Sequence, residues 1–102
     1  MTFENKKLTD QTIQRVSQIF KVLSDPTRIS ILYLLEKQEL NVGAIAQCLG
    51  MEQSAVSHQL RTLRTANLVK SRREGKTIYY SQDDEHVLDL LTQAVKHTKH
   101  IQ

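Results

Sequence analysis

The stretch from residue 39 to residue 67, ELNVGAIAQCLGMEQSAVSHQLRTLRTAN, constrains the fold more than any other part of the chain. Its first half predicts a short helix, with Asn41 as the N-cap and Gly50 as the stop. A second helix is expected almost at once, from about residue 53 to residue 66, with Asn67 in the left-handed conformation that ends it. Two helices joined by a short glycine-containing turn are typical of a helix-turn-helix.

Apolar residues at helical spacing predict two more helices before this unit. One is expected over residues 9–23, and the next begins where Asp25 can act as the N-cap and Pro26 fits the first helical position. The second of these helices is apolar around much of its circumference, so we expect it to be central. The apolar positions are Ile13, Val16, Ile19, Phe20 and Leu23 in the first helix and Ile29, Ile31, Leu32, Leu34 and Leu35 in the second.

The sequence LVKSRREGKTIYYS, which follows the helix-turn-helix, predicts a β-hairpin. Residues 69–73 and 77–81 are expected to be strands because they are rich in β-branched and aromatic residues, and EGK is the turn. A last helix is expected over residues 83–100. The predicted fold is therefore mainly α with a β-hairpin wing, in a single winged helix-turn-helix domain over residues 1–102, of which residues 1–8 are expected to be flexible.

Composition narrows the setting in which such a domain works. No apolar run reaches the roughly 18 residues that a membrane-spanning helix needs, and the first residues lack the apolar stretch of a secretory signal. Cys48 is the single cysteine and cannot form an internal disulfide, which agrees with a reducing compartment. We therefore expect a cytoplasmic protein that does not bind a membrane. No nucleophile–base pair or phosphate-binding loop is visible, so neither an enzyme nor a small-molecule substrate is expected.

The second helix of the predicted helix-turn-helix has one apolar side and one polar side, at about 100° per residue. The polar side consists of Ser54, Ser57, His58 and Arg61. Such a face suits a DNA major groove, with Ser and His reaching base edges and Arg61 reaching phosphate, although a solvated face without a partner is the alternative. Residues 61–76 include six basic residues and one acid. On the wing, Arg72, Arg73 and Lys76 suit phosphate or minor-groove contacts.

Three segments of the chain resemble the ArsR/SmtB family of winged-helix, metal-responsive repressors. They are LSDPTRISILYLL, QSAVSHQLRTLRTANLV and RREGKTIYYS, and the resemblance extends from about residue 10 to residue 100. It implies a homodimer that binds double-stranded operator DNA, with the first and last helices at the dimer interface. It also places Gln53, together with Ser54, Ser57 and His58, at the groove-facing positions of the family. Glu52 departs from the Ser or Thr that is frequent there and is a poorer N-cap.

Many members of that family sense metal with a pair of cysteines in the third helix, and this chain has no such pair. Residues 41–44 are Asn, Val, Gly and Ala, and only Cys48 lies nearby. At helical spacing Cys48 is expected to share the apolar face of Ile45 and Leu49, which predicts a buried structural cysteine. A thiolate-rich site for arsenic, cadmium or lead is therefore not expected.

The last helix carries three of the four histidines of the chain. At about 100° per residue, His86, His97 and His100 fall within an arc of about 60°. His97 and His100 can reach one ion together, whereas the helical rise places His86 about 16 Å from His97, too far to join them. Two antiparallel copies of the helix would instead close two equivalent sites. The alternative is a solvated helix end, where cations are favoured at the C-terminus.

Each shared site would take Asp84 and His86 from one chain and His97 and His100 from its partner. Three nitrogens and one oxygen in a tetrahedron suit Zn²⁺, and Co²⁺ can replace it. Asp84 is the ligand least fixed by geometry, because it would point away from the histidine arc if the helix included it, and Ser81 with Asp84 also fits a capping box. The full pattern, DxH…HxxH, is similar to that of the zinc-sensing, CzrA-like branch of the family.

These observations predict a zinc-responsive repressor. The apo homodimer would bind a two-fold operator with its reading helices in successive major grooves, and Zn²⁺ at the last helices would release the DNA. The resemblance implies that this serves metal efflux. A backbone acceptor near Asn67 is a candidate partner for the second ring N–H of His97. Two alternatives stay open, namely a response to Co²⁺ or Ni²⁺ on the same scaffold and a redox response through Cys48.

Overall fold

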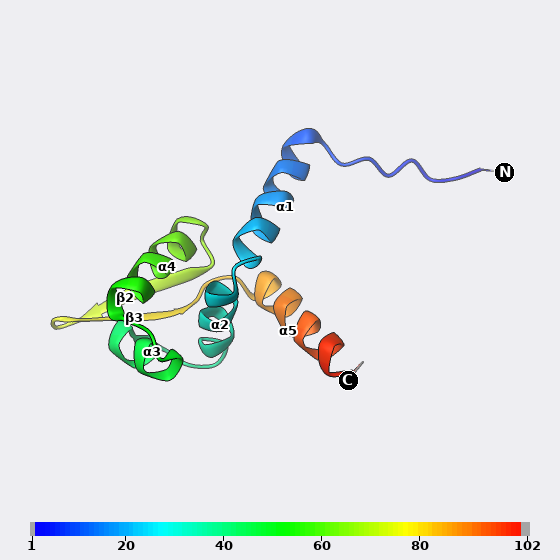
Figure 1. Ribbon diagram of the computed structural model, residues 1–102. Coiled ribbons are helices and arrows are strands. Elements are labelled where there is room, and N and C mark those ends of the chain that lie inside the picture. The colour runs from blue at the N-terminus through cyan, green and yellow to red at the C-terminus, as the bar shows by residue number, and fades with distance from the viewer. Residues whose placement is uncertain (1, 101–102) are drawn as a thin grey trace.

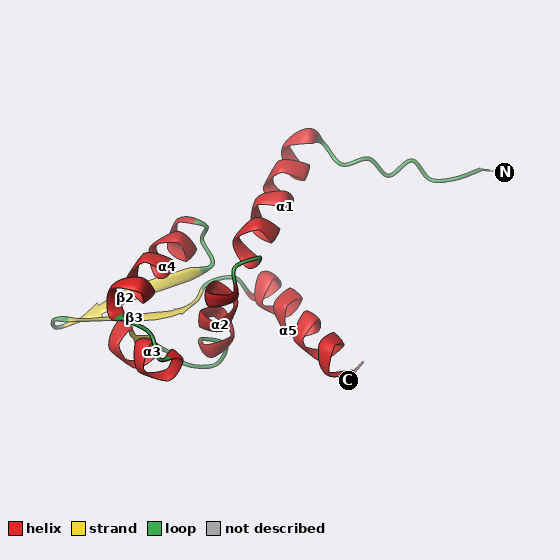
Figure 2. Cartoon of the chain, viewed as in Figure 1, coloured by secondary structure: helices red, strands yellow, loops and turns green. Residues whose placement is uncertain are grey.

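Five helices and three short strands follow one another in the computed structural model, which describes residues 2–100. They are α1 (Asp10–Leu23), α2 (Pro26–Leu34), β1 (Leu40–Asn41), α3 (Val42–Leu49), α4 (Gln53–Thr65), β2 (Val69–Glu74), β3 (Thr77–Gln82) and α5 (Glu85–His100) (Figure 1). The predicted winged helix-turn-helix is confirmed, and Figure 2 shows its strands beside α3 and α4, with α1 and α5 on the other side of α2. Met1 and Gln102, the limits of the predicted domain, lie outside the described residues.

Local side-chain chemistry sets where the helices begin and end. The backbone N–H of Arg28 donates to Asp25 Oδ2 (3.0 Å) at the start of α2, and the N–H of Ala44 donates to Asn41 Oδ1 (2.8 Å) at the start of α3. Gly50 ends α3 in the left-handed region, at φ 64°. These caps are the predicted ones and satisfy backbone groups that a helix end leaves unpaired. Glu52 makes no side-chain cap at α4, as its poor capping chemistry implied.

Helix α2 is central, as predicted, and contacts each of the other four helices. Ile31, Leu32 and Leu35 are buried at its inner side and meet the apolar faces of those helices. The core extends from them to both sides of the molecule. Its remaining members are Val22, Ile45, Ala46, Val56, Leu60, Leu63, Leu68, Val69, Val87 and Leu91.

The wing is a three-stranded antiparallel sheet in the order β1-β3-β2. The predicted hairpin of β2 and β3 is present, but each strand is one residue longer than expected, and Glu74 pairs with Thr77. The turn is therefore Gly75 and Lys76, not EGK, and Gly75 has φ 63°. Strand β1 was not predicted, because two residues are too short to show an alternating pattern. It pairs Leu40 with Tyr80 and Asn41 with Tyr79. Since α3 begins at the next residue, β1 attaches the wing directly to the helix-turn-helix.

Helix α1 leaves most of its apolar side uncovered. Ile13, Val16 and Phe20 are 49%, 40% and 53% exposed, and Leu90 on α5 is 42% exposed. An apolar groove between the two helices is lined by Phe20, Leu23, Ser24, Ile29, Leu90, Leu91 and Ala94. Apolar surface of this extent on neighbouring helices is typical of an association face. Within residues 2–100 no helix is long and apolar enough to cross a membrane.

Candidate functional site

The polar side of α4 faces solvent, as its periodicity predicted. The structure exposes all five residues that were expected to face DNA on this helix, namely Gln53, Ser54, Ser57, His58 and Arg61. The opposite side is held in the core by Val56, Leu60 and Leu63, which are at most 1% exposed. A helix fixed in this way presents hydroxyl, amide and imidazole groups outward, which are the groups that hydrogen-bond to base edges in a major groove.

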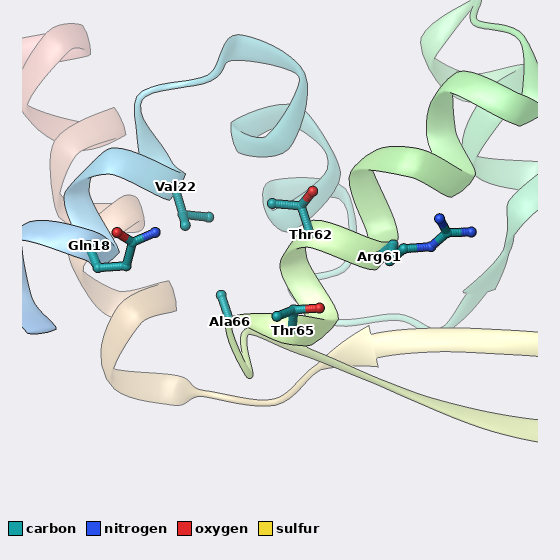
Figure 3. A pocket seen from close by; sticks show the side chains of 6 residues that line it. All are labelled: Gln18, Val22, Arg61, Thr62, Thr65 and Ala66. Carbon is teal, nitrogen blue, oxygen red and sulfur yellow. The ribbon is translucent and has the colours of Figure 1, made fainter.

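A groove of about 400 Å³ lies between α4 and α1, and Arg61 is one of the residues that line it. Figure 3 shows Gln18 and Val22 on α1 facing the end of α4, while the Arg61 side chain extends away from α1. The other lining residues are Thr62, Thr65 and Ala66. Beyond this end of α4, Asn67 has φ 61°, the left-handed conformation that was predicted for it. The guanidinium of Arg61 is therefore available on the side of α4 that carries Ser57 and His58.

The wing carries three predicted DNA contacts, and the structure surrounds one of them with acids. Arg73 and Lys76 are exposed and form no ion pair within residues 2–100. Arg72 instead donates from Nε to both carboxylate oxygens of Glu39 (2.9 and 2.8 Å) and from Nη1 to Glu74 Oε2 (2.8 Å). The hydrogen bond from Arg72 lowers the pKa of the Glu39 carboxyl, and the two carboxylates raise the pKa of Arg72.

Asp84 lies just before α5 and caps it. The backbone N–H groups of His86 and Val87 donate to Asp84 Oδ1 at 2.9 and 3.2 Å. The predicted start of the helix at residue 83 is corrected to Glu85, and the capping box of Ser81 with Asp84 does not form, because Ser81 is paired within β3. Since Asp84 precedes the helix, the expectation that it points away from the histidines does not apply. Its Oδ1 lies 3.6 Å from His86 Nδ1.

The histidines of α5 are all exposed. The His86 side chain is 99% exposed, and His97 and His100 face solvent in the last turns of the same helix. No group of three His, Cys, Asp or Glu side chains within residues 2–100 of one chain could hold a metal ion. The structure brings Asp84 and His86 together and leaves His97 and His100 at the far end of the helix.

Cys48 is exposed, so the prediction of a buried structural cysteine is wrong. The buried side of α3 is defined by Ile45 and Ala46, at 0% and 4% exposed, with Leu49 half-buried between them. At about 100° per residue, Cys48 lies about 60° beyond Ile45 in the direction away from Ala46. Periodicity placed Cys48 on one apolar face with Ile45 and Leu49, but packing against α2 and α4 centres the buried face on Ile45 and Ala46.

Comparison with known proteins identifies the family. The sequence profile of the bacterial regulatory protein, arsR family, matches residues 25–71. The HTH-type transcriptional regulator NmtR of Mycobacterium tuberculosis is 44% identical over 92% of this chain and 78% of its own length. The chain belongs to the ArsR family. It is a winged-helix transcriptional regulator, not an enzyme, as the sequence predicted.

Two further relatives bear on metal and on assembly. The cadmium resistance transcriptional regulatory protein CadC homologue of Staphylococcus aureus is 40% identical over 94% of this ArsR-family chain and 80% of its own length. A homodimeric winged helix-turn-helix DNA-binding domain from Mycobacterium bovis has 30% identity and a TM-score of 0.81, covering 99% of this chain and 94% of that one. The ArsR-type fold thus occurs as a homodimer in a structure that matches this one along nearly its full length.

Sequence reasoning missed the partners of Arg72. Tyr79 lies opposite Arg72 in the observed register, and the guanidinium lies 4.8 Å from the centre of its ring. The predicted three-residue turn EGK would instead place residue 78 opposite Arg72, so the sequence did not indicate this contact. Glu39 gave no signal either, since it is 33 residues from Arg72 and reaches it only because β1 joins the sheet.

Proposed function

We propose that this ArsR-family regulator is a metal-responsive repressor whose homodimer binds operator DNA and releases it when Zn²⁺ binds at α5. The observation that carries the proposal is the arrangement of the candidate ligands. Three exposed histidines lie along α5 with a carboxylate 3.6 Å from the first, and one chain offers no complete cluster within residues 2–100. The candidate ligands of one site are thus divided between the two ends of α5, and a second copy of the chain would complete the site.

The homodimer is supported by the uncovered apolar side of α1 and by its position beside α5. Phe20 of α1 and Leu90 of α5 line one groove, so a second copy that covers this groove also approaches α5. The homodimeric relative from Mycobacterium bovis has the same fold. An interface of the first and last helices therefore removes exposed apolar surface from water and brings the α5 helices of two chains together.

The donor set favours zinc. Asp84 and His86 of one chain with His97 and His100 of the other supply three imidazole nitrogens and one carboxylate oxygen, which suit tetrahedral Zn²⁺ and also accept Co²⁺. Within residues 2–100 the hydrogen bonds to the Asp84 carboxylate involve Oδ1, and Oδ2 accepts none. The CadC homologue is named for cadmium resistance, but a single cysteine gives this chain no thiolate pair. The DxH…HxxH pattern supports the zinc-sensing, CzrA-like branch instead.

DNA recognition is assigned to α4 and the wing. Gln53, Ser54, Ser57 and His58 face the base edges, and Arg61 reaches a phosphate. Arg73 and Lys76 extend the phosphate contacts along the wing. Two copies of α4 then enter successive major grooves of a two-fold operator, about one helical turn apart.

Zinc and DNA act on one another through the shape of the dimer. A zinc ion shared by two α5 helices favours the arrangement of chains that it ties together. If that arrangement separates the reading helices from the half-sites, zinc weakens DNA binding by the same free energy by which DNA weakens zinc binding. We assign the second ring N–H of His97 to a backbone acceptor near Asn67, at the end of α4, because a ligand histidine usually donates to a fixed acceptor.

A zinc titration of the protein–DNA complex tests the proposal. Zinc should lower the affinity for DNA, and zinc that binds without changing that affinity would refute the switch. His97→Ala should bind DNA normally and lose the zinc response. Lys96→Ala, on the neighbouring exposed position of α5, is the matched control and should keep both properties. Loss of DNA binding in His97→Ala alone would make His97 a structural residue.

A redox response through Cys48 is the second candidate, and the exposure of Cys48 favours it. An accessible thiol can be oxidised, whereas a buried one is inert. Oxidation that releases DNA in the presence of a metal chelator, and that Cys48→Ser abolishes, would identify this mechanism. Release by Co²⁺ or Ni²⁺ with no release by Zn²⁺ would identify a different metal on the same scaffold.

A further inference from the structure

The Arg72 side chain connects β2 to β3 and to the residue before β1. It starts on β2, lies over the ring of Tyr79 on β3, and ends against Glu39, the residue before β1. Its Nε donates to both carboxylate oxygens of Glu39, and its Nη2 lies 2.7 Å from Glu39 Oε1. Its Nη1 forms an ion pair with Glu74. A planar guanidinium with this many aligned contacts is held in one orientation.

Arg72 and Arg73 lie on opposite faces of the sheet. Successive residues of a strand alternate between faces, so Arg73 shares a face with its cross-strand partner Ile78, and Arg72 shares the other face with Tyr79. Ile78 lines a groove with Ser57 of the reading helix and with the start of α3. The face of Arg73 is therefore the face that the wing turns toward the helix-turn-helix, and Arg72 is on the far face.

The wing joins α3 through β1, the strand at the edge of the sheet. Strand β1 has two residues, and α3 starts directly after it, so this joint between the wing and the helix-turn-helix is short. The pair of Glu39 and Arg72 adds a side-chain link beside this joint. We infer that Arg72 is a positioning residue, which holds the wing at its angle to α3 and α4 through Glu39 and Tyr79, and that it does not neutralise a DNA phosphate.

Charge compensation supports the same conclusion. A phosphate that bound the guanidinium of Arg72 would displace the carboxylates of Glu39 and Glu74, and both carboxylates would then lie close to DNA. Two freed carboxylates repel the DNA polyanion, so this repulsion offsets most of the attraction between Arg72 and the phosphate. Arg73 and Lys76 have no such partner within residues 2–100 and carry the phosphate contacts of the wing.

The inference rests on the DNA binding assigned under the proposed function, and it is tested on a two-fold duplex that the wild-type protein selects from a random library. Glu39→Gln removes a negative charge, which by simple electrostatics would raise DNA affinity. If Arg72 positions the wing, the affinity instead falls, by about two- to fivefold for the loss of one exposed network pair. Glu36→Gln is the matched control, because it removes the same charge three residues earlier and Glu36 forms no ion pair within residues 2–100. An affinity for Glu39→Gln equal to or above that of Glu36→Gln would overturn the inference.

A second pair of variants keeps the positive charge and changes only the shape of the side chain. Arg72→Lys keeps the charge but cannot reproduce the bidentate fork, so it should weaken binding, while Arg73→Lys should bind as wild type does. Arg72→Lys should leave the slope of log affinity against log salt unchanged, whereas Arg73→Gln should reduce it by about one. Full affinity in Arg72→Lys would make Arg72 a phosphate contact. A lowered melting temperature with unchanged affinity would make its role purely stabilising, which also overturns the inference. A wild-type protein that selects no duplex would refute the proposed function itself.

Discussion

Asp84 carries two assigned roles on one carboxylate, and two substitutions can separate them. Its Oδ1 accepts hydrogen bonds from the backbone of His86 and Val87, which makes it the cap of α5. The same oxygen lies 3.6 Å from His86 Nδ1, which makes the carboxylate a neighbour of the first histidine ligand. Asp84→Asn keeps an oxygen that can cap, while Asp84→Ala keeps neither function.

The two variants should differ in stability and agree in zinc binding. Loss of the cap in Asp84→Ala should cost about 1 kcal/mol, a decrease of about 4–8 °C in melting temperature for a domain of this size. Asparagine caps about as well as aspartate, so Asp84→Asn should lose only the favourable charge at the helix N-terminus, about 0.3–1 kcal/mol. Both variants lack the anionic ligand, so zinc affinity should fall in both by at least about 10–100-fold, the usual effect of removing a ligand's hydrogen-bond partner.

Stability is measured by thermal denaturation of the metal-free protein, at one protein concentration because a dimer melts higher when it is more concentrated. Zinc affinity is measured by competition with a chelator of known affinity. Asp84→Asn that binds zinc as tightly as the wild type would show that Asp84 only caps the helix. Asp84→Asn that melts as low as Asp84→Ala would refute the capping argument.

Four other outcomes follow from the structure. Arg61→Gln should lower the slope of log affinity against log salt by about one, and a changed sequence preference would make Arg61 a base reader instead. Phe20→Lys should give monomers in analytical ultracentrifugation, and persistent dimers would place the interface elsewhere. Zinc affinity should decrease as the pH is lowered, because imidazole must be neutral to bind metal, and a flat pH profile would exclude histidine ligation. Leu60→Ala should cost about 2–5 kcal/mol in urea denaturation, since Leu60 is 1% exposed, and a smaller loss would mean that the core closes around the gap.

The parts of the fold that the sequence predicted are those set by neighbouring residues. Asn41, Gly50 and Asn67 each act on backbone groups within a few positions, so their types alone locate the ends of α3 and α4. Strand β1 could not be predicted, because its pairing with Tyr80 depends on how the wing meets α3 and not on its own two residues. The start of α5 was misplaced by two residues, because acids suit a first turn and a cap equally well.

In the candidate site, too, the sequence predicted the features set by local pattern and missed those set by contacts between distant elements. The polar side of α4 follows from helical periodicity, because a helix with three buried residues on one side must expose the other. The exposure of Cys48 depends on which side of α3 packs against the neighbouring helices, and the pattern of apolar residues in α3 wrongly included Cys48 in the buried side. The partners of Arg72 come from elements far apart in the chain, so no local pattern could assign its charge to Glu39.

The uncovered side of α1 has a consequence for how the protein behaves in dilute solution. Val22 is the single buried residue of this helix, and 14 residues are about the length at which an isolated helix is only marginally stable in water. In a free chain the amide hydrogens of α1 should therefore exchange with solvent much faster than those of α4. As the concentration rises and copies associate, protection of α1 should appear together with the dimer. The abundance of the protein thus sets how much of its first helix is folded.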